Sequence, residues 1–92
     1  MKIKGQTQTY TAVIQPVDRK GVVDIDFMDE SGNRYASVGI GSSDMGSKES
    51  AAAQPQRIAD RFPEEDQPAI LKVAAELVRT AAEKLAPPKS KK

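Results

Sequence analysis

The side chains of this chain that could carry out chemistry are carboxylates and lysines, because the sequence contains neither cysteine nor histidine. Without these two residue types the usual zinc sites cannot be assembled, and the commonest general base is missing. Any reaction would have to depend on acids or amines alone. We therefore expect a protein that is not an enzyme and that uses no cofactor and no metal.

Asp24 and Asp26 are the most closely spaced carboxylates of a predicted strand. They alternate with apolar residues within residues 22–28, so both project from one side of that strand. With Asp29 and Glu30 they could chelate a hard cation or act as a carboxylate pair, but their spacing matches no calcium loop. The pattern is also typical of a solvent-facing strand side whose charges prevent sheet association. We favour that interpretation, and an acidic contact surface for a basic partner is the alternative.

A segment rich in glycine and serine, residues 41–54, begins with a sequence that approaches a phosphate-binding P-loop. A P-loop needs Gly, four residues, and then Gly-Lys-Ser/Thr between a strand and a helix. Here Ser47 and Lys48 stand in the reverse order, so the lysine is misplaced for the terminal phosphates. We expect residues 41–54 to be a flexible connector.

The net charge of +1 hides a separation of charge along the chain. Residues 1–21 carry four basic residues and one acid, whereas residues 22–45 carry five acids and one basic residue. The basic side chains near predicted strand ends could converge at one end of the sheet and attract phosphate groups. These are Lys2, Lys4, Arg19, Lys20 and Arg34. Tyr10 or Tyr35 would then offer an aromatic face for stacking.

The first half of the chain predicts an antiparallel meander. Strands are indicated at residues 6–17, 22–28 and 34–40 by β-branched and apolar residues in alternation. Residues 29–33 contain glycine and asparagine and form the turn between the second and third strands. The connections are short, so each strand pairs with its neighbour in the chain.

The second half predicts two helices. A short one covers residues 55–62, with Pro55 at its first position, and a long amphipathic one covers residues 64–86. The long helix has an apolar stripe at helical spacing that forms core: Ile70, Ala74, Leu77, Val78, Ala81 and Leu85. We predict a single α+β domain over residues 1–86, a three- to four-stranded antiparallel meander with both helices following and the long helix packed on one sheet face. Residues 87–92 form a disordered basic tail.

Three apolar side chains are poorly explained by this pattern, and Met28, Tyr35 and Phe62 are therefore candidates for an exposed contact patch. Small size and mixed-charge turns favour a protein that acts by binding. The partner-binding residues that we predict lie at strand ends and in turns: Lys2, Lys4, Arg19, Lys20, Asp29, Glu30, Asn33 and Arg34.

With strands over Gln6–Ile40 and the main helix over Glu64–Ala86, the chain resembles in architecture several small phage-encoded anti-CRISPR proteins, the inhibitors of type I CRISPR-Cas surveillance complexes. The resemblance implies docking on an RNA-guided Cas complex, with its guide RNA, and blocking of target-DNA binding. Basic residues such as Lys2 and Arg19 would face the RNA, and acids would face basic Cas surfaces. The alternative is a small nucleic-acid-binding or regulatory module of phage or plasmid origin.

The sequence also bears on location. Its first residues contain no apolar run typical of a signal peptide, and no segment approaches the length of a membrane span. We therefore expect a cytoplasmic protein, in the host bacterium if the chain is phage-encoded, with no membrane partner and no small-molecule substrate.

Overall fold

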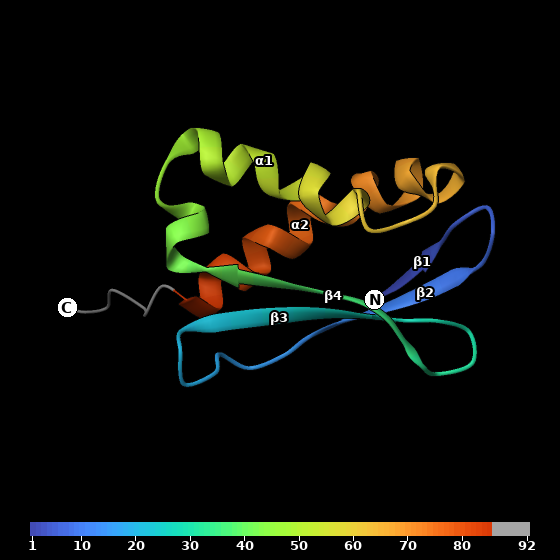
Figure 1. The fold of residues 1–92 in the computed structure, drawn as a ribbon, viewed down its shortest axis with the longest axis horizontal. Coiled ribbons are helices and arrows are strands. Elements are labelled where there is room, and N and C mark those ends of the chain that lie inside the picture. Colours follow the sequence, from blue (N-terminus) through green and yellow to red (C-terminus); the bar gives the residue numbers. More distant parts are fainter. Residues whose placement is uncertain (86–92) are drawn as a thin grey trace.

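The computed structural model describes residues 1–85 and confirms the α+β class. Four antiparallel strands form one sheet in the order β1-β2-β3-β4, and the helical elements follow in sequence (Figure 1). The strands are β1 (Lys2–Lys4), β2 (Thr9–Ile14), β3 (Val22–Met28) and β4 (Arg34–Gly41). The helical elements are η1 (Ser42–Met45), α1 (Lys48–Ala59), η2 (Glu64–Asp66) and α2 (Gln67–Leu85), where η denotes a 3₁₀ helix.

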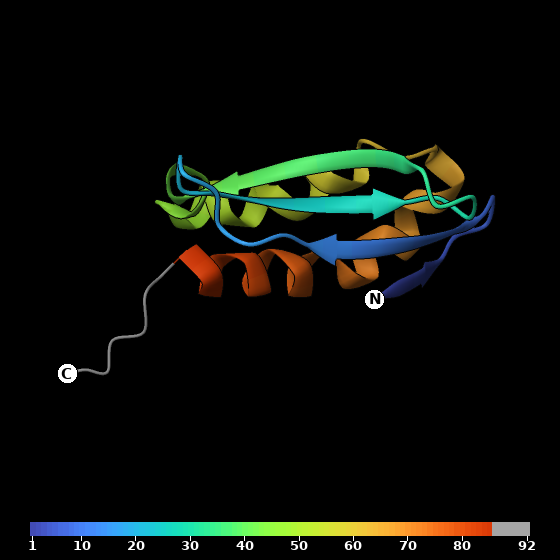
Figure 2. The same ribbon diagram turned by 90° about the horizontal axis from the view of Figure 1, so that it is seen from below.

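Both α-helices lie on the same face of the sheet, which leaves the other face open (Figures 1 and 2). The core lies between the two layers, and each of the four strands contributes side chains to it. The predicted stripe on α2 is confirmed, with Leu85 partly buried and the others fully buried: Ile70, Ala74, Leu77, Val78 and Ala81. No helix within residues 1–85 is long and apolar enough to cross a membrane.

The first predicted strand, residues 6–17, is wrong in its bounds. Residues 2–4 form a separate short strand, and the second strand covers only Thr9–Ile14. A tight turn separates the two, in which the Gly5 N–H donates to the Gln8 carbonyl oxygen over 2.9 Å. Ile3 pairs with Tyr10 and is buried, so its apolar side chain contributes to holding this short strand at the sheet edge.

The predicted connector over residues 41–54 and the predicted start of a helix at Pro55 are also wrong. Helix α1 begins at Lys48, and the Ser47 side chain caps it by accepting the Ser50 N–H over 3.0 Å. Three consecutive alanines, residues 51–53, then favour helix strongly. Pro55 lies inside the helix, where it removes a backbone donor that the cap and the alanines outweigh.

The long helix is predicted over residues 64–86, and the structure divides this range. Glu64–Asp66 form a 3₁₀ turn, and α2 proper runs from Gln67 to Leu85. The predicted basic tail at residues 87–92 lies outside the described residues.

The free edge of β4 is partly covered by the chain itself. Arg57 of α1 donates from Nη2 to the Gly39 carbonyl oxygen over 3.0 Å, and the Gly41 N–H donates to Asp44 Oδ2 over 2.8 Å. Two of the outward-facing backbone groups of this edge are therefore already paired, which disfavours the addition of a further strand here. The accessible part of the sheet is its open face.

Candidate functional site

The open face of the sheet is organised in rows by the strand register. One row runs from Lys2 through Thr11 and Met28 to Arg34, across all four strands. The next row joins Val13, Asp26 and Ser37. No helix of the described residues covers this face (Figure 2). These two rows, together with the neighbouring Gln15 and Asp24, define the site described below, which we call the open-face site; Lys2 and Lys4 lie at its rim.

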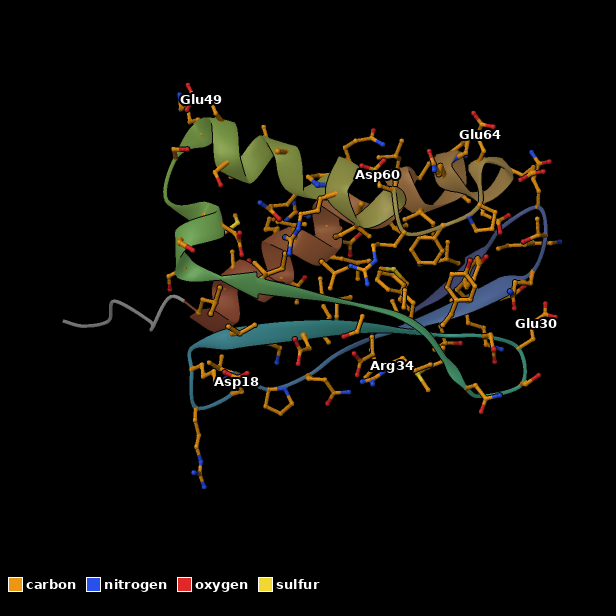
Figure 3. All side chains as sticks on the ribbon, in the orientation of Figure 1. Asp18, Glu30, Arg34, Glu49, Asp60 and Glu64 are labelled. Atoms are coloured by element: carbon orange, nitrogen blue, oxygen red, sulfur yellow. The ribbon has the colours of Figure 1, made fainter. Side chains whose placement is uncertain are left out.

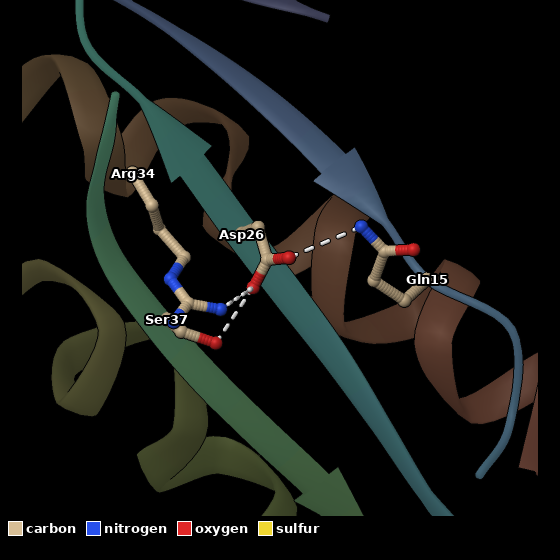
Figure 4. A network of polar contacts seen from close by, with 4 residues as sticks. All are labelled: Gln15, Asp26, Arg34 and Ser37. Carbon is tan, nitrogen blue, oxygen red and sulfur yellow. Dashed lines mark hydrogen bonds and ion pairs between the residues drawn. The ribbon is translucent and has the colours of Figure 1, made fainter. Parts of the chain in front are cut away.

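Asp26 forms the fixed polar centre of the open-face site (Figure 4). Its Oδ2 accepts from Gln15 Nε2 over 3.1 Å, and its Oδ1 accepts from Ser37 Oγ over 2.7 Å. Arg34 Nη1 lies 3.9 Å from Oδ1 and completes the group. The prediction that this strand side is freely solvated is wrong for Asp26, which is only 9 % exposed because these neighbours enclose it. The carboxylate connects three chain segments, and both of its oxygens have hydrogen-bond partners.

A β-bulge decides which side chains reach this face. Phe27 pairs with Ala36, but Met28 pairs with Arg34, so Tyr35 is the additional residue of β4. Its ring turns to the helix side, where it stacks on Phe62 with ring centroids 5.4 Å apart and an interplanar angle of 19°. Arg34 is thereby left on the open face beside Asp26.

None of the four aromatic residues of the chain lies on the open face. Tyr10 is fully buried, so the prediction that it offers a stacking face is wrong. Phe62 is only 5 % exposed and belongs to the core, so it forms no contact patch. Tyr35 is 40 % exposed but lies on the other side of the sheet. Base stacking on the open face, as in common RNA-binding sheets, therefore has no platform here.

The open face instead carries apolar and short polar side chains. Val13 is 41 % exposed beside Asp26, and Met28 is half-buried. Asp24 pairs with Gly39 on the same face and has no hydrogen-bond partner for its carboxylate within the described residues. Such a surface, apolar around a fixed polar centre and charged at the rim, suits a complementary protein surface.

The structure separates the eight predicted partner-binding residues into two groups. Asp29, Glu30, Asn33 and Arg34 lie at the β3–β4 turn, and the register places Lys2 and Lys4 at the same end of the sheet. Arg19 and Lys20 lie in the β2–β3 connection at the opposite end, beside Asp18. Figure 3 shows this separation through the labelled Asp18 and Glu30. The five basic residues therefore do not converge at one end.

Two of the predicted acids have structural roles. Asp29 Oδ1 accepts the N–H groups of Ser31 and Asn33, each over 2.9 Å, and so closes the β3–β4 turn. Glu30 Oε2 accepts the Thr9 N–H over 2.9 Å, which joins that turn to β2. These carboxylates are less available to a partner than the sequence suggests.

Gln15, Val13 and Ser37 also belong to the site, although they were not predicted from the sequence. The strand register could have identified Val13 and Ser37, because the residues that pair with Asp26 on the two neighbouring strands share its face. The buried carboxylate of Asp66 was likewise not predicted; it accepts from the Thr7 N–H over 2.8 Å, from the Thr7 hydroxyl and from the Tyr10 hydroxyl over 2.6 Å. Asp66 lies on the helix side and holds the fold together.

The described residues offer no metal site and no unpaired buried polar group. Among residues 1–85 no group of three or more acidic side chains lies close enough together to hold a metal ion. Every buried side-chain nitrogen and oxygen in this part of the chain has a hydrogen-bond partner. Comparison with known proteins found no matching family, no similar curated protein and no similar solved structure, so the functional argument rests on this geometry.

Proposed function

We propose that this protein is a non-enzymatic binding protein that docks on a larger protein or ribonucleoprotein complex through the open-face site. The observation that carries the proposal is an uncovered sheet face with an enclosed polar centre at Asp26 and an exposed apolar side chain, Val13, next to it. Because Asp26, Ser37 and Arg34 are already held in place by one another, a partner would lose little entropy in ordering them.

The charge of the open face supports a protein partner over naked nucleic acid at this surface. Asp24 and Asp26 lie at its centre and would repel phosphates, and Arg34 is already paired with Asp26. A protein with a basic side chain opposite Asp24 and an apolar group opposite Val13 would be complementary to this face in both charge and hydrophobicity.

The partner named in this proposal is inferred from the architectural resemblance to anti-CRISPR proteins. In that interpretation the chain is a phage-encoded inhibitor that docks on a type I surveillance complex and prevents target-DNA binding. Its size fits a role in which surface is occluded and no reaction takes place, since a standard interface needs only about 800 Å² from each partner.

The test compares two valines with the same exposed fraction. Val13 on the open face and Val17 in the β2–β3 connection are each 41 % exposed. Val13→Lys places a charged chain on the docking surface, while its ammonium can approach Asp26, so the fold is preserved. Val17→Lys makes the same change outside that surface. Circular dichroism of both variants checks that they are folded.

The assay measures target-DNA binding by a panel of purified type I surveillance complexes, each with its guide RNA, in the presence of the chain. We expect one complex to bind the wild-type chain and to lose DNA binding. Val13→Lys should weaken that inhibition by about tenfold or more, a change of about 1.4 kcal/mol, and Val17→Lys should leave it unchanged. Equal loss in both variants, or no inhibition in any complex, contradicts the proposal. Concentration-dependent dimerisation through Val13 in sedimentation would also overturn it, because the face would then be a self-interface.

A further inference from the structure

A groove separate from the open-face centre lies between β1 and the beginning of α2. It has a volume of about 400 Å³, and three lysines line it: Lys2 and Lys4 from the edge strand and Lys72 from the helix. The floor is apolar, formed in part by Ile3 and Val73. Lys72 and the existence of the groove are not evident from the sequence, because strand and helix are far apart in the chain.

None of the three lysines that line the groove makes an ion pair within the described residues. Within residues 1–85 the ion pair between Arg34 and Asp26 is the only one, and Glu65, the acid that also lines the groove, is too far from all three lysines to pair with them. All three lysines are exposed. Unpaired positive charges along one groove attract an anion from solution.

Protection of the sheet edge explains only part of this arrangement. Lysines on an edge strand discourage pairing with another chain, which accounts for Lys2 and Lys4. It does not account for Lys72, which lies on α2 across the groove. The alternation of β1 places Lys2 and Lys4 on one side of the strand, with Cα atoms about 7 Å apart.

We propose that this groove binds the phosphate backbone of a single-stranded nucleic acid. Lysine presents a point charge that suits phosphate, and no arginine lines the groove to form a two-pronged contact with a carboxylate. No aromatic residue lines it either, so the contact is with the backbone and is independent of base sequence. The site goes beyond the proposed docking function, and either assignment can fail without the other.

The test is the salt dependence of binding to a labelled oligouridylate of about ten nucleotides, followed by fluorescence anisotropy. Three phosphate contacts predict a slope of log K against log salt of about −2, from about −0.7 per contact with a single strand. Lys2→Gln with Lys4→Gln leaves one contact and reduces the slope to about −0.7, and Lys72→Gln alone leaves two contacts and gives about −1.4. Arg19→Gln with Lys20→Gln removes the same charge at the far end and should keep the slope of the wild type.

Three results would overturn this inference. The first is an equal decrease of slope in the Arg19 and Lys20 variant, which would show diffuse attraction by total charge. The second is competition by polyglutamate of the same length as effectively as by unlabelled oligouridylate, which would assign the groove to acidic peptides. The third is the absence of binding at low salt. Val13→Lys should bind the oligonucleotide like the wild type, so failure of the groove and failure of the docking surface are distinguished.

Discussion

Replacement of Asp66 by asparagine tests the part of the fold that joins the sheet to the helices. The Asp66 carboxylate is fully buried in the 3₁₀ turn that precedes α2, and it accepts three hydrogen bonds, two from Thr7 and one from Tyr10. Thr7 lies in the turn between β1 and β2, and Tyr10 lies in β2. Both residues are more than fifty positions from Asp66 in the chain. The carboxylate therefore fixes the end of the sheet that carries both proposed sites.

The expected loss of stability follows from the hydrogen bonds that an amide side chain cannot accept. Asparagine has one acceptor oxygen, so whichever way its side chain is turned, its NH₂ group meets either the Thr7 N–H or the hydroxyl groups of Thr7 and Tyr10. At least one hydrogen bond to a charged group is lost, which costs about 2 kcal/mol. A domain of 92 residues has a free energy of unfolding of about 5 to 10 kcal/mol, so Asp66→Asn should fold with a melting temperature lower by about 10 to 15 °C.

The loss should depend on pH in a defined direction. Burial alone would raise the pKa of Asp66, but hydrogen bonds from Thr7, Tyr10 and the Gln6 backbone outweigh burial and hold this pKa below its ordinary value of 3.8. A carboxyl group whose pKa is lowered by folding stabilises the fold fully above its unfolded value, and the stabilisation is lost as pH falls through the folded value. The difference between wild type and Asp66→Asn should therefore be constant near neutrality and shrink below about pH 4.

Urea unfolding followed by circular dichroism, at pH 7 and in steps down to pH 3, measures this difference. Glu64→Gln is the matched control, because Glu64 lies in the same 3₁₀ turn but is exposed, and its replacement should change stability by less than about 0.5 kcal/mol. An Asp66→Asn variant as stable as Glu64→Gln would refute the reasoning. So would a difference that persists unchanged at pH 3, since the carboxylate charge would then not be its source.

Three further predictions concern the same contacts. Gly5→Ala should destabilise the fold by about 1 to 3 kcal/mol in urea unfolding, because an added Cβ would lie 2.6 Å from Asp66 Oδ1; wild-type stability would contradict that packing. Burial and the hydrogen bond to Asp66 raise the pKa of Tyr10 to about 12, so absorbance titration should show one late phenol that Tyr10→Phe removes, and stability should decline only as pH rises from about 10 through 12. Asp26→Asn should lose about 1 kcal/mol of stability through its strand contacts, whereas Asp24→Asn should lose less than about 0.5 kcal/mol, and equal losses would argue against the network around Asp26.

The parts of the fold that the sequence predicts are those in which a local period decides burial. Helix α2 repeats apolar residues at helical spacing, so its core face, from Ile70 to Ala81, follows from the chain itself. The alternation in β3 likewise identifies Val23, Ile25 and Phe27 as core. In both elements the local period alone identifies the residues that face the core.

Other parts depend on contacts between distant segments and were therefore missed. From the sequence, Asp66 is an ordinary acidic residue at the start of a helix. It becomes a buried hydrogen-bond acceptor because the fold brings Thr7 and Tyr10 next to it. The start of α1 was misplaced because Pro55 and the small residues before it indicate a break, whereas the Ser47 cap and the alanines decide in favour of helix. The groove that contains Lys72 exists only after β1 has docked beside α2.

The bulge in β4 decides which side chains of this strand the open face presents. If the alternation of β4 continued unbroken below Ala36, Tyr35 would project from the open face and Arg34 toward the helices. The face would then present an aromatic ring beside uncompensated acids. With the bulge, Tyr35 stacks on Phe62 and Arg34 lies beside Asp26, so the open face has no stacking group and its acidic centre has one neighbouring arginine. This arrangement is consistent with the proposal of a protein partner for the open face and of phosphate binding at the lysine groove, where no aromatic ring is needed.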